Sequence, residues 1–451
     1  MRKQILILFT IALAISLSAN TITLDEAKAM ALENNSDYQA KAAALKSSEW
    51  AKTGAMSSFL PSLSLSGTYL YMDPATQVQT GAGSISLNKD MRTISLNLSQ
   101  PLFVGGKLWQ AYLISKMGED IAVLNLQSQQ LKLINEVESK YLSILQLLEL
   151  DTISRLDRDS AVRNMEIAQL KLESGIIAMA DYLRFKSRQA SKEVSLLQAE
   201  TALQIALKDF ANYLGSEDVL TPQALSGDKY EAMLAILDGY DTGAMRTLSL
   251  RLQKLGQDQN LSLKLIDRGV EISRRSYDIS KGSFMPTVML TGSRQYKENG
   301  IDRYEFSPSD QIMLNVSIPI LPQIGNYAAN RKAFYEHKKA QWEAVSAKSG
   351  ITLGIDAAVM NLVSSAKQVN AAKLARDYTE ASYEQILQRY QLNMISSLEL
   401  LDADLMLSSA RIAYTNSLFS FYKNRSALIQ ILALNDPAIL DAQIQSISVE
   451  E

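Results

Sequence analysis

The sequence predicts a mostly helical chain with a smaller β portion, in which one unit of helix, strand, strand, long helix and long helix occurs twice. Three observations predict this class. Only nine prolines occur in 451 residues, and none lies in the stretches 102–221 and 323–436. Two pairs of short runs alternate between apolar and polar residues, one pair ahead of each proline-free stretch. Landmarks of the first half recur in the second at one constant offset, as Pro101 does at Pro319. A duplicated unit is the simplest explanation.

Residues 1–19 are expected to be a signal peptide for export. Arg2 and Lys3 precede an apolar run from Ile5 to Ile15, and small residues follow, which is the order of regions in such peptides. The alternative is a membrane anchor, but a spanning helix needs about 20 apolar residues and this run is shorter. No later run reaches that length. If the mature chain enters a membrane, it must therefore do so as a β-barrel.

Four strands are predicted where apolar and polar residues alternate with a period of two. They span residues 62–71, 93–102, 287–296 and 311–320. In the first run Leu63, Leu65 and Tyr69 alternate with serine and threonine, whereas Arg294 interrupts the third. The lengths fit either a tilted membrane strand of about 9–11 residues or a soluble sandwich strand with one buried face. Because four strands cannot close a barrel around a lumen, a barrel would require several chains.

Four long helices are predicted within the proline-free stretches. They span residues 105–173, 177–214, 325–391 and 395–434. Gly175 and Asn393 are the expected turns between paired helices, because both residue types tolerate left-handed backbone. The last helix carries an apolar stripe with spacings of three and four. Its members are Leu398, Leu401, Leu405, Ile412, Phe419, Tyr422 and Ile429. Neither such stripes nor the strands have enough partners within one chain, which predicts an oligomer.

The chain is expected to divide at its Gly- and Pro-containing segments. The bounds are 20–214 for the first repeat, 215–245 for a connector, 246–434 for the second repeat and 435–451 for a C-terminal tail. Pro222, Gly227 and Gly239 give the connector a mixed character. Residues 72–92 and 297–310 join the two strands of each repeat and are expected to be exposed loops.

Composition excludes several classes of function. The net charge of -3 and pI near 5.6 provide no cationic excess for nucleic acid. There is no cysteine, hence no disulfide, thiol nucleophile or cysteine-linked lipid. The one histidine, His337, lies in a charged stretch and is expected on a solvated helix face. Without a phosphate loop, nucleophile elbow or usual zinc ligands, we expect no enzyme, metal site or cofactor. Catalysis by carboxylates alone is the one enzymatic chemistry that stays open.

Four short motifs occur in a fixed order along the chain. They are Leu24-Asp25-Glu26-Ala27, Phe59-Leu60-Pro61-Ser62-Leu63, Gln100-Pro101-Leu102-Phe103-Val104-Gly105-Gly106 and Leu398-Glu399-Leu400-Leu401-Asp402-Ala403. In these motifs and in its duplication, the chain resembles the TolC family of outer-membrane efflux and secretion channels over nearly its whole mature length. The resemblance implies a homotrimer in the outer membrane, whose 12-stranded β-barrel continues into a 12-helix periplasmic α-barrel. It also implies a passive exit duct of a tripartite efflux pump or type I secretion system, opened by a periplasmic adaptor and driven by an inner-membrane transporter.

The resemblance also assigns residues to the periplasmic end of the helices. An acidic gate falls on Glu399 and Asp402, which are three residues apart and so share a helix face. Three copies would gather six carboxylates, attract cations and raise some of the carboxylate pKa values. The alternative is a solvated helix face that happens to be acidic. Gate-closing contacts fall on Tyr390 and Asp181, but the arginine that accompanies them in the family corresponds to Ile395.

Contact with the adaptor is expected at the two helix turns, at Gly175, Ile176, Asn393 and Met394. The segment Pro319–Asn326 departs from the family, since it replaces the usual Phe-x-Gly-Gly turn. The exported substrate, the identity of adaptor and pump, and the resting state do not follow from the sequence. A non-conducting envelope coiled-coil protein is the alternative, although it does not explain two pairs of alternating strands.

Overall fold

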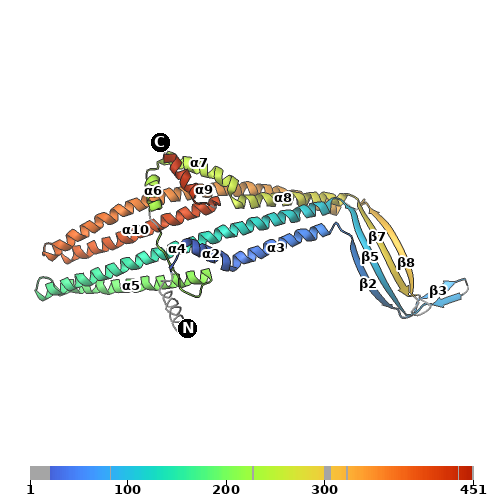
Figure 1. Cartoon of the computed structure of the whole chain (residues 1–451), viewed down its shortest axis with the longest axis horizontal. Coiled ribbons are helices and arrows are strands. Elements are labelled where there is room, and N and C mark those ends of the chain that lie inside the picture. Colours follow the sequence, from blue (N-terminus) through green and yellow to red (C-terminus); the bar gives the residue numbers. More distant parts are fainter. Residues whose placement is uncertain are drawn as a thin grey trace, which may run out of the picture. The chain divides into compact units, whose positions relative to one another are not determined.

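The computed structural model describes residues 21–81, 83–225, 228–298, 306–320, 324–434 and 436–448. The predicted signal peptide, residues 1–19, lies outside the described residues. The chain forms two compact units. The first consists of Met1–Ala40, Leu126–Ser262 and Lys348–Glu451, and the second of Lys41–Asn125 and Leu263–Ala347. Two long helices, α4 (Lys107–Glu173) and α9 (Ile324–Gln391), contribute residues to both units (Figure 1). No helix in the described ranges is long and apolar enough to cross a membrane.

The second unit contains a four-stranded antiparallel sheet in the order β2-β5-β7-β8. The strands are β2 (Ser62–Tyr71), β5 (Asp90–Val104), β7 (Thr287–Glu298) and β8 (Phe306–Ser317). Strand β5 pairs with β7, so the hairpin of the first repeat lies beside the hairpin of the second. Strands β2 and β8 are left at the edges. Helices α3 (Ser36–Ser57) and α8 (Leu261–Lys281) lead into the two hairpins, the latter through the short helix η1 (Gly282–Phe284).

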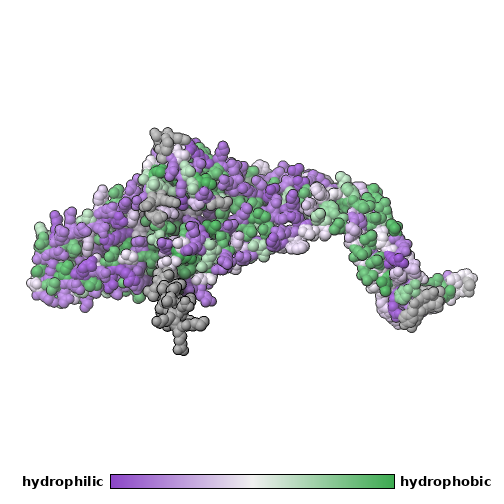
Figure 2. Space-filling view, in the orientation of Figure 1, coloured by the Kyte–Doolittle hydropathy of each residue, from purple (hydrophilic) through white to green (hydrophobic). Residues whose placement is uncertain are grey.

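Apolar and polar side chains separate onto the two faces of this sheet. Leu63 pairs with Leu98, and Leu65 with Leu96, so leucines lie opposite one another on one face. The intervening partners, such as Ser66 and Ser95, place hydroxyl groups on the other face. Within the single chain the leucines stay exposed, and Figure 2 shows hydrophobic side chains gathered over these strands. Exposed apolar faces commonly mark surfaces that contact another protein or a membrane.

The β structure differs most from the prediction in the two segments that join the strands of each repeat. Residues 72–92, expected to be a loop, contain a hairpin of β3 (Gln77–Thr80) and β4 (Gly83–Ser86). Its alternation is too short to stand out in the sequence. Strand β8 begins at Phe306 although Pro308 follows, because a missing N–H is tolerated in an edge strand.

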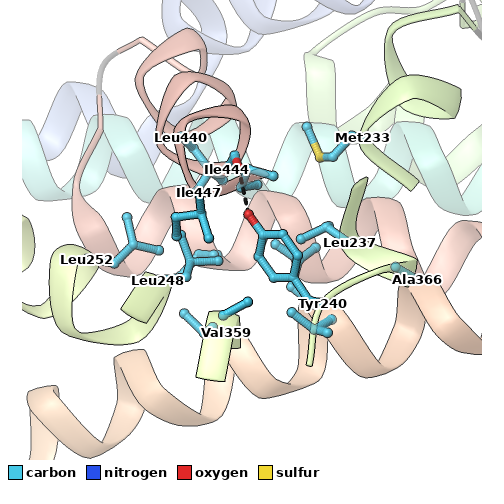
Figure 3. Close-up of a cluster of buried hydrophobic side chains, with 14 of the residues drawn as sticks. Met233, Leu237, Tyr240, Leu248, Leu252, Val359, Ala366, Leu440, Ile444 and Ile447 are labelled. Atoms are coloured by element: carbon cyan, nitrogen blue, oxygen red, sulfur yellow. Dashed lines mark hydrogen bonds between the residues drawn. The ribbon is translucent and has the colours of Figure 1, made fainter. Parts of the chain in front are cut away.

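The first unit has its main core where helices of the second repeat meet the C-terminal segment. Helix α6 (Asp228–Asp238), α7 (Thr242–Gln259) and α11 (Ala438–Ser448) pack their apolar side chains against α9 and α10 (Ser397–Leu432). Figure 3 shows this cluster, in which the Tyr240 hydroxyl donates a hydrogen bond to the Ile444 carbonyl oxygen at 2.6 Å. The tail therefore contains a fixed helix.

The expected end of the connector at residue 245 falls inside helix α7. This helix begins at Thr242 because the carboxylate of Asp241 accepts a hydrogen bond from the Ala244 N–H at 2.7 Å and so caps it. It ends at Gln259, and α8 begins after Asn260. The first repeat has the same break between α2 (Leu24–Asn34) and α3, at Asn35. In both repeats the break between these two helices therefore lies at an asparagine.

A second core holds the start of the first repeat against helices α4 and α5 (Met179–Leu214). Strand β1 (Thr21–Ile22) pairs in parallel with β6 (Thr221–Pro222). The buried Tyr141 hydroxyl lies 3.1 Å from the Ile22 carbonyl oxygen and 2.6 Å from that of Gln223. This one side chain thus ties both short strands to α4.

The apolar stripe predicted for α10 changes character along the helix. Phe419 is buried, as a core stripe requires, but Leu398 and Leu405 are 62% and 50% exposed. In this first half of α10 the buried positions are instead Leu400 and Leu407. At Leu398 and Leu405 the predicted stripe therefore lies on the face that turns away from the chain's own helices.

Candidate functional site

Helices α4 and α9 turn into α5 and α10 through the same backbone geometry (Figure 1). Gly175 and Asn393 adopt positive φ angles of 72° and 63°. The amides of Ile176 and Met394 then donate to the carbonyl oxygens five residues earlier, at 2.8 and 2.9 Å. This is the left-handed closure that commonly ends helices. It leaves Ile176 50% and Met394 68% exposed, so each turn presents an apolar side chain to solvent.

Lys171, in the last turn of α4, is buried and reaches the end of α9. Its ammonium group donates to the Tyr390 carbonyl oxygen at 2.5 Å and to the Asn393 side-chain oxygen. The nitrogen also lies 4.3 Å from the centre of the Tyr390 ring. Burial lowers the pKa of this group. Lys171 therefore connects the helical hairpin of the first repeat to the turn of the second, and a cation at a helix C-terminus complements the helix dipole.

Tyr390 is almost fully buried beside this lysine. Its ring packs on that of Phe185 with centres 5.8 Å apart, and its hydroxyl lies 3.4 Å from the Ser397 hydroxyl. Burial raises the pKa of the Tyr390 hydroxyl, the hydrogen bond with Ser397 lowers it, and the nearby Asp181 carboxylate raises it. Tyr390 thus joins α5, α9 and the start of α10.

Asp181, the expected partner of Tyr390, lines one cavity together with this tyrosine. In the described part of the chain, no hydrogen bond joins the two side chains. The cavity has a volume of about 420 Å³ and is also lined by Lys171, Arg184 and Ser397. Asp181 pairs with Arg184 of its own helix at 3.4 Å. The structure therefore brings the two predicted gate residues together, and Lys171 makes the close contacts. Ile395, at the position of the missing arginine, lines this cavity as well.

Glu399 and Asp402 are both exposed and line one small cavity between α9 and α10. Its volume is about 170 Å³, and hydroxyl-bearing Thr379 and Ser382 line it too. The Glu399 carboxylate accepts hydrogen bonds from the Ser396 hydroxyl at 2.9 Å and the Ser396 N–H at 3.3 Å. The Ser396 hydroxyl accepts from the Glu399 N–H at 3.3 Å, which completes a capping box. Glu399, three residues after the N-cap Ser396, therefore helps to fix the start of helix α10.

Sequence reasoning missed a set of buried polar side chains between the two helical hairpins. Lys192 of α5 contacts the Asp157 carboxylate of α4 and donates to the Ser408 hydroxyl of α10 at 2.7 Å. The Ser408 hydroxyl in turn donates to Asp157, and all three residues are buried. Nearby, the Arg188 guanidinium donates to Asp404 at 2.9 and 2.8 Å. These contacts join the first repeat to the second along a polar seam.

The arrangement offers no evident catalytic chemistry. Across the residues that the structure describes, no group of three or more His, Asp or Glu side chains could hold a metal ion. The polar side chains of the polar seam and of the two helix turns form hydrogen bonds with one another and with the helix ends. Such contacts hold neighbouring helices together.

Comparison with known families matches most of this chain to one of them. Residues 29–216 and 257–434 match the family described as outer membrane efflux protein. Outer membrane protein TolC of Escherichia coli strain K12 is 21% identical over 393 residues, which cover 86% of this chain and 77% of that protein. TolC of Vibrio cholerae is 22% identical over 428 residues, which cover 91% of this chain and 93% of the relative.

A solved structure shares the fold as well. The structure of CusC, described with reference to folding and transmembrane channel formation, superposes with a TM-score of 0.77. The alignment covers 92% of this chain and 93% of CusC, at 14% sequence identity. The mostly helical fold with its small sheet is therefore one that a known channel protein also adopts.

Proposed function

Because the chain belongs to the outer membrane efflux protein family, we propose that three copies assemble into a continuous exit duct that a periplasmic adaptor opens and an inner-membrane transporter drives. Each copy contributes the sheet of its second unit to a β-barrel and its long helices to an α-barrel. In this proposal the duct itself is passive, and the inner-membrane transporter supplies the energy.

Membership of this family bears on several predictions made from the sequence. The resemblance to TolC is confirmed, and with it the location in the outer membrane with a long helical part in the periplasm. The general function of the family is efflux across the outer membrane. The relatives of this chain are channel proteins, which confirms the prediction that the chain is not an enzyme.

The open sheet is the observation that carries the trimeric barrel. Within the described residues, edge strands β2 and β8 have no partner on their outer sides. Strand directions alternate across the sheet, so β8 of one copy and β2 of the next would continue the antiparallel order. Three such sheets give 12 strands, enough to close around an aqueous lumen. Closure removes both exposed edges and places the leucine face toward lipid.

Exposed apolar side chains on the helices support the same assembly. Leu398 and Leu405 of α10 are at least half exposed, as are Val194, Leu197 and Ile205 of α5. These positions face away from the chain's own core. A neighbouring copy would bury them, as the seam of an α-helical barrel requires.

The cavity around Tyr390 and Asp181 is the proposed closing contact within each copy. Lys171 supplies the cation that Ile395 cannot. Glu399 and Asp402 share one cavity and face solvent, so three copies could form an acidic ring at the periplasmic mouth. Such a ring would concentrate cations at the entrance.

The helix turns are the proposed docking points for the adaptor. Gly175 and Asn393 shape the two turns, and Ile176 and Met394 expose apolar surface on them. An adaptor that binds there would act close to Lys171 and Tyr390, which lie in the last turns of α4 and α9. The pump would then connect to the duct through the adaptor.

Single-channel recording in planar bilayers tests this function. We would compare wild type with Glu399→Ala/Asp402→Ala, with and without a trivalent cation on the periplasmic side. Glu384→Ala is the control, because Glu384 is exposed on neighbouring α9 but does not line the acidic cavity. Light scattering gives the number of chains per particle.

Trimers that conduct, and that the cation blocks only while both gate carboxylates are present, are the expected result. Conductance with unchanged block in the double variant would remove the acidic gate and retain the duct. Folded protein that never conducts would instead favour a non-conducting coiled-coil protein of the envelope.

A further inference from the structure

The polar face of the four-stranded sheet is almost free of charge. Cross-strand pairing aligns its side chains in four rows that run across β2, β5, β7 and β8. The rows are Ser62, Ser99, Thr291 and Met313; Ser64, Asn97, Ser293 and Gln311; Ser66, Ser95, Gln295 and Ser309; and Thr68, Thr93, Lys297 and Ser307. Hydroxyl and amide groups fill nearly every position. Lys297 is the one charged residue among these sixteen.

The lysine is not neutralised by its surroundings in the described part of the sheet. Its side chain is exposed, its row partners Thr93 and Ser307 are neutral, and it forms no ion pair with another described residue. The charged neighbours Arg294 and Asp310 belong to the opposite face, because they share a row with Leu65 and Leu96. There they pair with each other at 3.7 Å. Among the sixteen described positions of these rows, Lys297 is therefore the one cation, and its row partners are neutral.

We propose that Lys297 determines the ion selectivity of the barrel, where one ammonium group from each copy forms a cationic ring that favours anionic over cationic solutes. This inference rests on the proposed trimeric barrel, which turns the polar face toward the lumen. The lysine lies near the loop end of β7, at the far end of the hairpins from the long helices. The ring would act on solutes that leave the duct.

The neutral wall is what allows so few charges to matter. Fixed charges set the local ion concentrations within roughly a Debye length, about 10 Å at 0.1 M salt and 3 Å at 1 M. Rows of hydroxyl and amide groups bind water but do not compensate a positive charge. The resulting preference for anions should be clear at low salt and weak at 1 M.

Introduced cysteines allow the charge to be changed after the channel has assembled, because the natural chain has no cysteine. Lys297→Cys would be treated with a cationic or an anionic methanethiosulfonate reagent, and the reversal potential measured in a KCl gradient at 0.1 M. The background is Glu399→Ala/Asp402→Ala, which removes the acidic pair as a second source of selectivity. Tyr296→Cys is the control, since it is the adjacent residue and faces the other side of the sheet.

Loss of the lysine should raise the potassium-to-chloride permeability ratio about twofold, because the anion-attracting field is removed. The cationic reagent should restore the original ratio and the anionic reagent should raise it further. Tyr296→Cys should respond to neither reagent. A conducting channel whose reversal potential ignores both charges at position 297 would overturn the assignment and retain the duct. If no variant conducts, wild type included, the proposed duct fails and the assignment fails with it.

Discussion

The ammonium group of Lys171 donates a hydrogen bond to the carbonyl oxygen of Tyr390 at 2.5 Å, and so joins helix α4 to the end of helix α9. The same group contacts Asn393 in the turn that follows. These helices come from different repeats of the chain. The link fixes the two helical hairpins to each other at the point where an adaptor is proposed to bind. A cation thus reaches this turn from α4, although Ile395 stands at the position where the family resemblance expects an arginine.

Lys171→Met should shift the duct toward its conducting state by about 10- to 100-fold. Methionine keeps the length and the apolar stem, but it cannot donate to Tyr390 or Asn393. Hydrogen bonds that involve a charged group contribute about 1.5–3 kcal/mol, and about 1.4 kcal/mol corresponds to a tenfold change in equilibrium. Open probability in planar bilayers measures the shift, because the link is proposed to stabilise the closed state.

Lys186→Met is the matched control for this variant. Lys186 lies on α5 near the same end of the helices, but its side chain is exposed. It should leave the open probability unchanged. An equal effect of both substitutions would show that the loss of any nearby cation is enough, and Lys171 would then have no special role.

The sequence was a good guide to the elements because their signals are local. Period-two alternation located the strands, and two long stretches without proline located the helices. The hairpin β3–β4 escaped notice because four-residue strands carry too few alternations. The predicted apolar stripe on α10 meets the chain's own core at Phe419, but Leu398 and Leu405 point away from that core. Spacing alone does not say whether an apolar face meets the same chain or a neighbouring one.

The site was harder to predict from the sequence, because its contacts join distant parts of the chain. Gly175 and Asn393 could be predicted as turns, since their backbone preference is a property of the residue. Lys171 could have been noticed only as a cation near the end of a helix, a common feature. Its partner Tyr390 lies in the other repeat, and no local pattern predicts their distance. The buried contacts of Lys192 were missed for the same reason.

Lys192→Met should reduce the free energy of unfolding by about 3–5 kcal/mol, because Asp157 would remain buried without its cation. The double variant Asp157→Leu/Lys192→Met removes both charges and should recover most of this loss. Urea unfolding followed by circular dichroism measures both values. Lys140→Met is the control, since Lys140 and Asp209 form a pair with side chains 33% and 58% exposed, for which about 0–1 kcal/mol is expected. A double variant as unstable as Lys192→Met would contradict this explanation.

A new charge should reduce assembly on the leucine face of the sheet and should be tolerated on the polar face. Leu65→Arg places a cation on the leucine face, which is proposed to meet lipid, at a cost of about 2–4 kcal/mol near the middle of the bilayer. Ser64→Arg, at the adjacent residue, places the same side chain on the polar face and should be tolerated. The amount of assembled, heat-modifiable protein in outer-membrane fractions measures the difference. Equal assembly of both variants would argue against a membrane barrel.

Tyr422→Phe should make the protein less sensitive to alkaline pH. The Tyr422 ring packs among aromatic side chains, with its centre 4.6 Å from that of Tyr230 and 5.7 Å from that of Phe419. Burial raises the pKa of the Tyr422 hydroxyl from 10.0 to about 12. A raised pKa in the folded state means that the unfolded chain loses this proton first. The stabilising contribution is therefore complete below pH 10 and is lost as the pH rises toward 12.

Within this window the free energy of unfolding should fall by about 1.4 kcal/mol per pH unit for each such proton. The phenylalanine variant has no proton to release at position 422, so its slope should be smaller by that amount. Urea unfolding at several pH values between 9 and 12 gives the slopes. Tyr378→Phe is the control for the loss of a hydroxyl, because that side chain is 71% exposed. If Tyr422→Phe and wild type lost stability at the same rate, the Tyr422 hydroxyl would have to ionise as readily in the folded protein as in the unfolded chain, and its burial would not oppose ionisation.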